Sequence, residues 1–227
     1  MVFNLFKKLK GVEQYVPPLC DLLAVTKSIC MFSFSEIQKQ VIQKLTNRLS
    51  PSLTYHNVSH TLDVLKQAEL IAGKEGITNK EDLLLIKISA LYHDIGFVNV
   101  YSGHEEESCR IALPELESFG FSASQIEKVM GMIRATKVPQ QPQNLMEQIL
   151  CDSDLDYLGR SDFFTIGEGL YQEFLVKKIV ANYQDWNLLQ IRFLEKHHYF
   201  TRTSKQRRQK QKEVHFKAIK AKVGMSV

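Results

Sequence analysis

Apolar residues recur every three or four positions along most of the chain, from about residue 33 to residue 222. This spacing places them on one face of an α-helix, which has 3.6 residues per turn. A half-buried strand would instead show strict alternation, and no segment shows it convincingly. The pattern therefore predicts an all-α fold, a helical bundle.

Polar residues and glycines divide this pattern into separate helices. Ser33 and Ser122 each precede a Glu or Gln by three residues, which is the capping-box spacing of a helix start. Asn79 is expected to cap another helix, which should end in a left-handed conformation at Gly96. Pro114 is expected to kink or divide the next helix. The last helices are predicted over about 162–178, 185–198 and 203–222.

The chain has 227 residues, of which 44% are hydrophobic, and this suits one globular domain with terminal extensions. We expect an N-terminal helical extension over residues 1–32, a core over 33–180 and C-terminal helices over 181–227. A chain of this size buries roughly 70–75% of its unfolded surface, so its core needs no stabilising metal or disulfide. A metal in this protein would therefore serve chemistry.

No apolar run approaches the roughly 20 residues of a membrane span, and the amino terminus lacks the features of a signal peptide. These observations predict a cytoplasmic protein. The four cysteines form no C-x-x-C pair, which disfavours a zinc ribbon or a redox motif.

The net charge is +4, and nine basic residues but only one acid lie between residues 202 and 222. Such a segment could bind nucleic acid or anionic lipid. It lacks interleaved aromatic residues and a nucleic-acid-binding motif, so weak or no nucleic-acid binding is predicted. The oligomeric state stays open, with a homodimer as one alternative.

The segment YHNVSH contains two histidines four residues apart, His56 and His60. Residues at this spacing share a helix face, so both rings can point to one place. Taken alone, such a pair more often reflects core packing or surface coincidence than a metal site.

A second histidine-containing segment, ALYHDIGF, closes a strongly apolar helix with His93 and Asp94. A carboxylate at a helix C-terminus is electrostatically unfavourable unless a cation is nearby. The segment CDSDLD then places Asp152, Asp154 and Asp156 after another apolar helix. Asp152 directly continues the apolar segment, so we expect it to point inward, with a solvated or capping role for at least one of the other two.

Together, His60, His93, Asp94 and Asp152 supply two imidazoles and two carboxylates. This set suits an open site for a divalent transition ion such as Mn, Fe, Co, Ni or Zn, completed by water. It differs from structural zinc sites, which are closed and rich in thiolates. An ion with open positions can activate water, which favours hydrolysis.

The order H…HD…D resembles the HD-domain superfamily of metal-dependent phosphohydrolases, over roughly residues 50–160. The stretch YHNVSHTLDV is also similar to the opening motif of class I cyclic nucleotide phosphodiesterases. The resemblance implies that His56 is a general acid, His60 a metal ligand and Asp94 a bridge between two ions, with Mg allowed at the second site. It implies a small phosphorylated substrate, such as a nucleotide, and a phosphodiesterase or nucleotidase activity.

Departures from these families leave the substrate open. The next histidine after Asp94 is His104, and the cyclic dinucleotide motif G-Y-P is absent. His104 is a candidate second-metal ligand or phosphate donor, or else a helix-terminal residue at the surface. Lys137 and Arg160 are candidate phosphate-binding residues, or else ordinary surface charges. A non-catalytic signalling or scaffold module and a di-iron oxygenase are the alternative functions.

Overall fold

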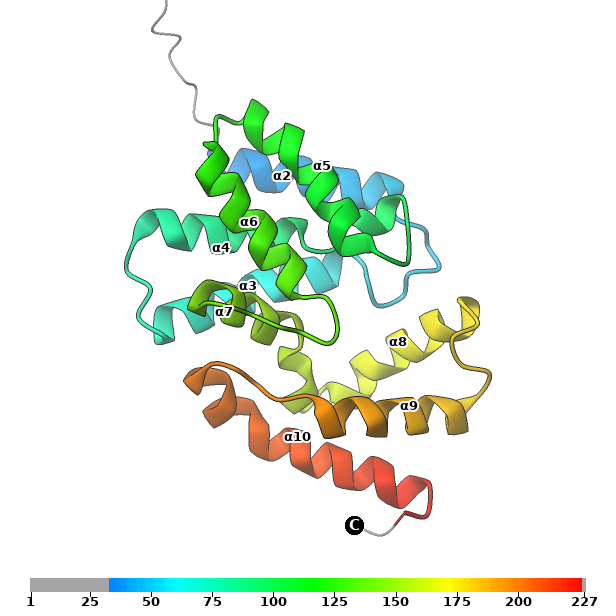
Figure 1. Cartoon of the computed structure of the whole chain (residues 1–227). Coiled ribbons are helices and arrows are strands. Elements are labelled where there is room, and N and C mark those ends of the chain that lie inside the picture. Colours follow the sequence, from blue (N-terminus) through cyan, green and yellow to red (C-terminus); the bar gives the residue numbers. More distant parts are fainter. Residues whose placement is uncertain (1–32, 226–227) are drawn as a thin grey trace, which may run out of the picture. The chain divides into compact units, whose positions relative to one another are not determined.

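The computed structural model describes residues 33–225, which contain nine α-helices, two short 3₁₀ helices and no strand (Figure 1). The α-helices are α2 (Phe34–Arg48), α3 (Val58–Lys74), α4 (Lys80–Tyr92), α5 (His104–Ser118), α6 (Ala123–Ala135), α7 (Leu145–Asp154), α8 (Phe163–Val176), α9 (Tyr183–Lys196) and α10 (Arg202–Lys222). The 3₁₀ helices are η1 (Ile95–Val98) and η2 (Asp156–Gly159). The predicted all-α fold is confirmed. The expected N-terminal extension, residues 1–32, lies outside the described residues.

The predicted helix starts are present with their caps. The Ser33 hydroxyl accepts a hydrogen bond from the Glu36 amide at the start of α2, and Ser122 caps α6 through the Gln125 amide in the same way. The Asn79 side chain accepts from two amides at the start of α4. Each cap satisfies amide groups that have no partner within the helix.

One expectation about a helix end is wrong. α4 ends at Tyr92, and Gly96, within η1, does not adopt a left-handed conformation. Gly96 is needed for a different reason, since a Cβ there would lie 2.1 Å from the His104 carbonyl oxygen. α5 continues through Pro114, so the helix is not divided there, and a kink stays a prediction.

The main hydrophobic core is formed by the helices from α2 through α7. Its fully buried members include Ile71 of α3, Leu85 and Ile88 of α4, Leu116 of α5 and Ile149 of α7. α3 lies against both α4 and α7 (Figure 1). The core therefore holds together the ends of α3, α4 and α7, which carry the candidate site.

The three last helices lie on the side of α7 away from α2 and α5 (Figure 1), where α8 and α10 contact η2 and α10 also contacts α3. Phe163, Leu194 and Ile219, one each from α8, α9 and α10, share a second hydrophobic cluster. The Arg208 guanidinium of α10 donates to the buried Asp156 carboxylate of η2 at 2.8 Å. The division between residues 180 and 181 stays a prediction.

The basic segment of residues 202–222 is only partly solvated. Arg207 and Arg208 turn toward Asp156, and Lys212 is buried. This arrangement favours a structural role for part of its charge. Among the described residues, no helix is long and apolar enough to cross a membrane.

Candidate metal centre

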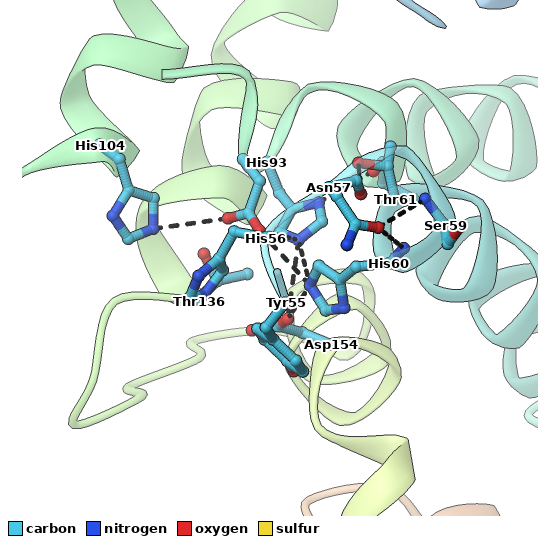
Figure 2. Close-up of polar contacts among 12 residues, drawn as sticks. Tyr55, His56, Asn57, Ser59, His60, Thr61, His93, His104, Thr136 and Asp154 are labelled. Carbon is cyan, nitrogen blue, oxygen red and sulfur yellow. Dashed lines mark hydrogen bonds and ion pairs between the residues drawn. The ribbon is translucent and has the colours of Figure 1, made fainter. Parts of the chain in front are cut away.

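Two imidazoles from different helices face each other at the centre of the candidate site (Figure 2). His60 lies in the first turn of α3, and His93 directly follows α4; their Nε2 atoms are 3.3 Å apart. The Asn57 side chain caps α3 and accepts from the His60 amide, which fixes the start of this helix. The His93 Nδ1 lies 2.9 Å from the Ala90 carbonyl oxygen, to which it can donate. That hydrogen bond leaves the His93 Nε2 free to act as a ligand.

Two carboxylates complete the cluster. Asp94 Oδ2 lies 3.4 Å from His60 Nε2 and 3.2 Å from His93 Nε2. Asp154 Oδ1 lies 3.2 Å and 3.6 Å from the same two nitrogens. Asp94 Oδ2 is buried and has no hydrogen-bond partner, which is costly for an ionised carboxylate.

The electrostatics of this cluster are those of a cation site. Burial favours neutral imidazole, but the carboxylates of Asp154 and Asp94 outweigh it and raise the pKa of His60 to about 9. Burial and the same two carboxylates act on His93, whose pKa lies well above its ordinary value. Burial would raise the pKa of Asp154, but the two histidines lower it to about 2. The pocket therefore favours positive charge, which protons or a metal ion can supply.

The residues present fit a divalent transition ion. His60, His93 and Asp154 each offer a ligand atom, and these atoms all lie within 4.8 Å of one another. Asp94 adds a carboxylate oxygen that lies within 3.4 Å of the Nε2 atoms of both histidines. Imidazole and carboxylate together suit the ions predicted from the sequence.

Asp152 does not belong to this cluster, so the expectation that it points toward the histidines is corrected. Asp152 and Asp154 leave α7 in different directions. The Asp152 carboxylate accepts from the amides of Phe200 and Thr201 at 2.9 and 2.8 Å, and from the Thr201 hydroxyl at 2.6 Å. Thr201 is the N-cap of α10, and a carboxylate is stabilised at a helix N-terminus. Asp152 therefore holds the start of α10 against α7, and Asp154 takes the place beside the histidines.

Arg160 and Lys137 differ in their surroundings. The Arg160 guanidinium donates to Asp63 at 2.6 Å and to Asp162 at 2.9 and 3.0 Å, and lies 3.7 Å from Asp156. These carboxylates take up most of its donors, which weakens the case for phosphate binding. Lys137 is exposed after α6, and its role stays a prediction.

His56 does not join the cluster but is held beside it by a buried glutamate. Its Nδ1 lies 2.5 Å from Glu173 Oε1, and the same oxygen accepts from the Tyr101 hydroxyl at 2.8 Å. Glu173 Oε2 accepts from the amides of Tyr55 and His56, each at 3.1 Å. Burial would raise the pKa of Glu173, but these hydrogen bonds and the charge of His56 lower it. Glu173 thus orients the His56 ring.

Phe97 contacts both His56 and a fourth histidine of the site, His104. The His56 ring stacks on Phe97 with centroids 4.3 Å apart, and the His104 ring stacks on it at 4.0 Å. His104 Nε2 lies 3.4 Å from Asp94 Oδ1. Asp94 therefore has one oxygen toward His60 and His93 and the other toward His104.

Glu173, Tyr101 and Phe97 had no assigned role in the sequence. Glu173 lies in FFTIGEGLYQEFLV, which we expected only to pack on the metal-bearing helices. The available signal was an acid within an apolar helix, since burying a carboxylate is costly without partners. Its partner His56 is 117 residues away, so spacing alone could not connect them.

Comparisons with known proteins give a family match and a structural match. Residues 57–157 match the family model described as the HD domain. The fold is similar to the crystal structure of a predicted HD superfamily hydrolase from an uncultured Thermotogales bacterium. The two chains share 23% identity with a TM-score of 0.53, over 92% of this chain and 96% of the other. No curated protein gives a significant match.

Proposed function

Since residues 57–157 are an HD domain, we propose that this chain is a metal-dependent phosphohydrolase, a phosphodiesterase or nucleotidase that acts on a nucleotide-type phosphoester. The observation that carries the proposal is the convergence of the imidazole nitrogens of His60 and His93 with the carboxylates of Asp94 and Asp154. The histidine–glutamate pair beside them adds a group that can transfer a proton.

The proposed ligands are His60, His93, Asp94 and Asp154. A divalent transition ion held by them would lower the pKa of water and polarise the phosphoester. The Ala90 carbonyl oxygen keeps the His93 ring in the tautomer that presents Nε2. The hydrophobic core behind α3, α4 and α7 fixes the backbone that carries all four ligands.

His56 is the proposed general acid. Its Nδ1 is bonded to Glu173, so Nε2 is the ring nitrogen that can give a proton to the departing oxygen of the substrate. The Glu173 carboxylate holds the ring in this orientation. Tyr101 holds the same carboxylate oxygen from its other side and so limits its movement.

His104 is proposed to serve a second position on the far side of Asp94. Because Asp94 Oδ1 lies toward His104 and Oδ2 toward His60 and His93, its carboxylate could bridge two ions. With a single ion, His104 would instead donate a hydrogen bond to a phosphate oxygen.

The mechanism predicts a separation of metal binding from turnover. His56→Ala should retain its metal but lose roughly 10²-fold in turnover of a phosphodiester with a poor leaving group. The loss should shrink with a nitrophenyl ester, whose leaving group needs little protonation. His198→Ala is a matched control, because His198 is exposed and lies outside the site.

The assay is a phosphoester panel on protein reloaded with each candidate metal, with metal content measured in parallel. Equal losses for the two esters at full metal content would mean that His56 positions substrate and does not donate a proton. Loss of metal from His56→Ala would make His56 a ligand. A fully metallated wild-type protein that hydrolyses no phosphoester would refute the proposed function.

A further inference from the structure

A cavity of about 350 Å³ lies between α8 and α9, with the last turn of α10 at its edge. It shares no residue with the candidate metal centre. Its lining residues are Phe164, Gly167 and Glu168 of α8, Tyr183, Trp186, Asn187 and Gln190 of α9, and Lys222 of α10. Its volume lies at the lower end of the range of small-molecule sites, about 300–1,000 Å³.

Two aromatic rings at this cavity remain largely uncovered. Phe164 is 43% exposed and Tyr183 is 53% exposed. Tyr183 is nevertheless held in place, since its ring stacks on Tyr171 at 4.0 Å and its hydroxyl bonds to Glu168 at 2.7 Å. A fixed, exposed ring is a preformed surface on which a planar ligand can stack.

Gly167 keeps the cavity open. A Cβ at this position would only reach ordinary contact distance, 3.9 Å, from Gln190 Oε1 and Trp186 Cζ2. A larger side chain there would therefore extend into the cavity without straining the backbone. The absence of a side chain at Gly167 leaves one edge of the buried Trp186 ring facing the space.

The charge at the cavity is uneven. The Lys222 ammonium lies 4.4 Å from the centre of the Phe164 ring and, among the described residues, has no carboxylate partner. The Glu168 oxygens already accept from Tyr183 and Gln172. Lys222 is thus a cation at this cavity that remains available to a ligand, while Glu168 keeps its negative charge on the α8 side and Asn187 and Gln190 supply amide groups.

We propose that this cavity binds a small planar aromatic anion, with its ring on the faces of Phe164 and Tyr183 and its negative group on Lys222. A carboxylate and a phosphate share this chemistry. Aromatic stacking and a charge-assisted hydrogen bond provide the two halves of the recognition. The site is independent of the proposed hydrolase activity.

Trp186 provides a selective reporter, because it is the single tryptophan of the chain. Its emission should be followed in metal-free full-length protein during titration with benzoate and with AMP. Benzyl alcohol and adenosine keep the ring without the charge, while acetate and inorganic phosphate keep the charge without the ring. We expect benzoate or AMP to produce a saturable change, with a dissociation constant of about 1 mM or tighter, and the four partial compounds to bind at least tenfold more weakly. The comparison of benzoate with AMP distinguishes a carboxylate from a phosphate.

Two variants and two controls locate the binding. Gly167→Leu should abolish the change by filling the cavity, and Lys222→Gln should weaken binding about tenfold. Gly73→Leu places the same side chain in open space on α3, and Lys217→Gln removes an exposed charge from α10; both should bind like the wild type. No saturable change with either anion, or undiminished binding in Gly167→Leu or in Lys222→Gln, would overturn the proposal.

Discussion

Asp152 and Asp154 are two residues apart on α7, and the structure predicts opposite consequences for the same substitution at each. Asp154→Asn removes a charged group beside His60 and His93. Loss of a group that only supports a ligand typically costs about 10–100-fold in metal affinity, so loss of a proposed ligand should cost at least roughly 100-fold. Asp152→Asn should leave metal affinity within about threefold of the wild type, because its carboxylate lies outside the cluster.

The stability cost of Asp152→Asn follows from its three hydrogen bonds. The carboxylate accepts from the amides of Phe200 and Thr201 and from the Thr201 hydroxyl. An amide side chain keeps only one acceptor oxygen, so at least one of the two backbone amides loses its partner. That loss costs about 1–3 kcal/mol, which in a chain of this length lowers Tm by roughly 2–12 °C.

The measurements are metal content after loading with Mn²⁺, metal affinity by calorimetry, and thermal unfolding of both metal-free variants. A loss of metal from Asp152→Asn at an unchanged Tm, with full metal retention in Asp154→Asn, would refute the assignment. It would show that α7 presents the other carboxylate to the histidines in solution.

Four further results are expected. Because the pKa of His60 is about 9, a proton must leave before the ring binds a metal. Metal affinity measured by calorimetry should therefore rise at least about tenfold per pH unit between pH 6 and 8, and a flat profile would contradict this. Glu173→Gln should keep its metal but lower turnover by about tenfold or more, with the largest loss for poor leaving groups. An equal loss for all leaving groups would exclude the idea that Glu173 acts through the general acid His56. Arg208→Ala leaves the buried Asp156 with fewer partners and should lower the free energy of unfolding by about 1–3 kcal/mol in denaturant titrations, whereas the exposed Arg202→Ala should not. Single-stranded RNA should bind weakly at physiological salt in filter-binding assays, and tight binding there would instead assign the basic segment to nucleic acid.

Helix starts could be predicted from the sequence because they depend on local chemistry. Ser33 and Ser122 form the expected capping boxes, since donor and acceptor lie within one turn. The convergence of His60, His93 and Asp94 could also be anticipated, because an acid at the end of an apolar helix needs a nearby cation.

The side of α7 that faces the histidines could not be predicted. Asp152 and Asp156 are four residues apart, and both contact residues that return from later in the chain, Thr201 and Arg208. Both sides of α7 are buried once the chain returns through Thr201 and Arg208. Apolar periodicity identifies the buried side of a helix only where one side alone is buried. Which aspartate faces the histidines therefore depended on tertiary contacts that the local pattern does not contain.

The contacts of Glu173, Thr201 and Arg208 limit how far the HD domain is modular. The matched segment ends at residue 157, yet these three residues beyond it hold His56, Asp152 and Asp156. An excised fragment of residues 57–157 would expose Asp152 and Asp156, which are buried in the longer chain, and would lack His56 itself. A portable unit that keeps every described partner of the site must therefore run at least from Tyr55 into α10, which makes the boundary recognised by sequence comparison a poor guide for truncation or domain transplantation.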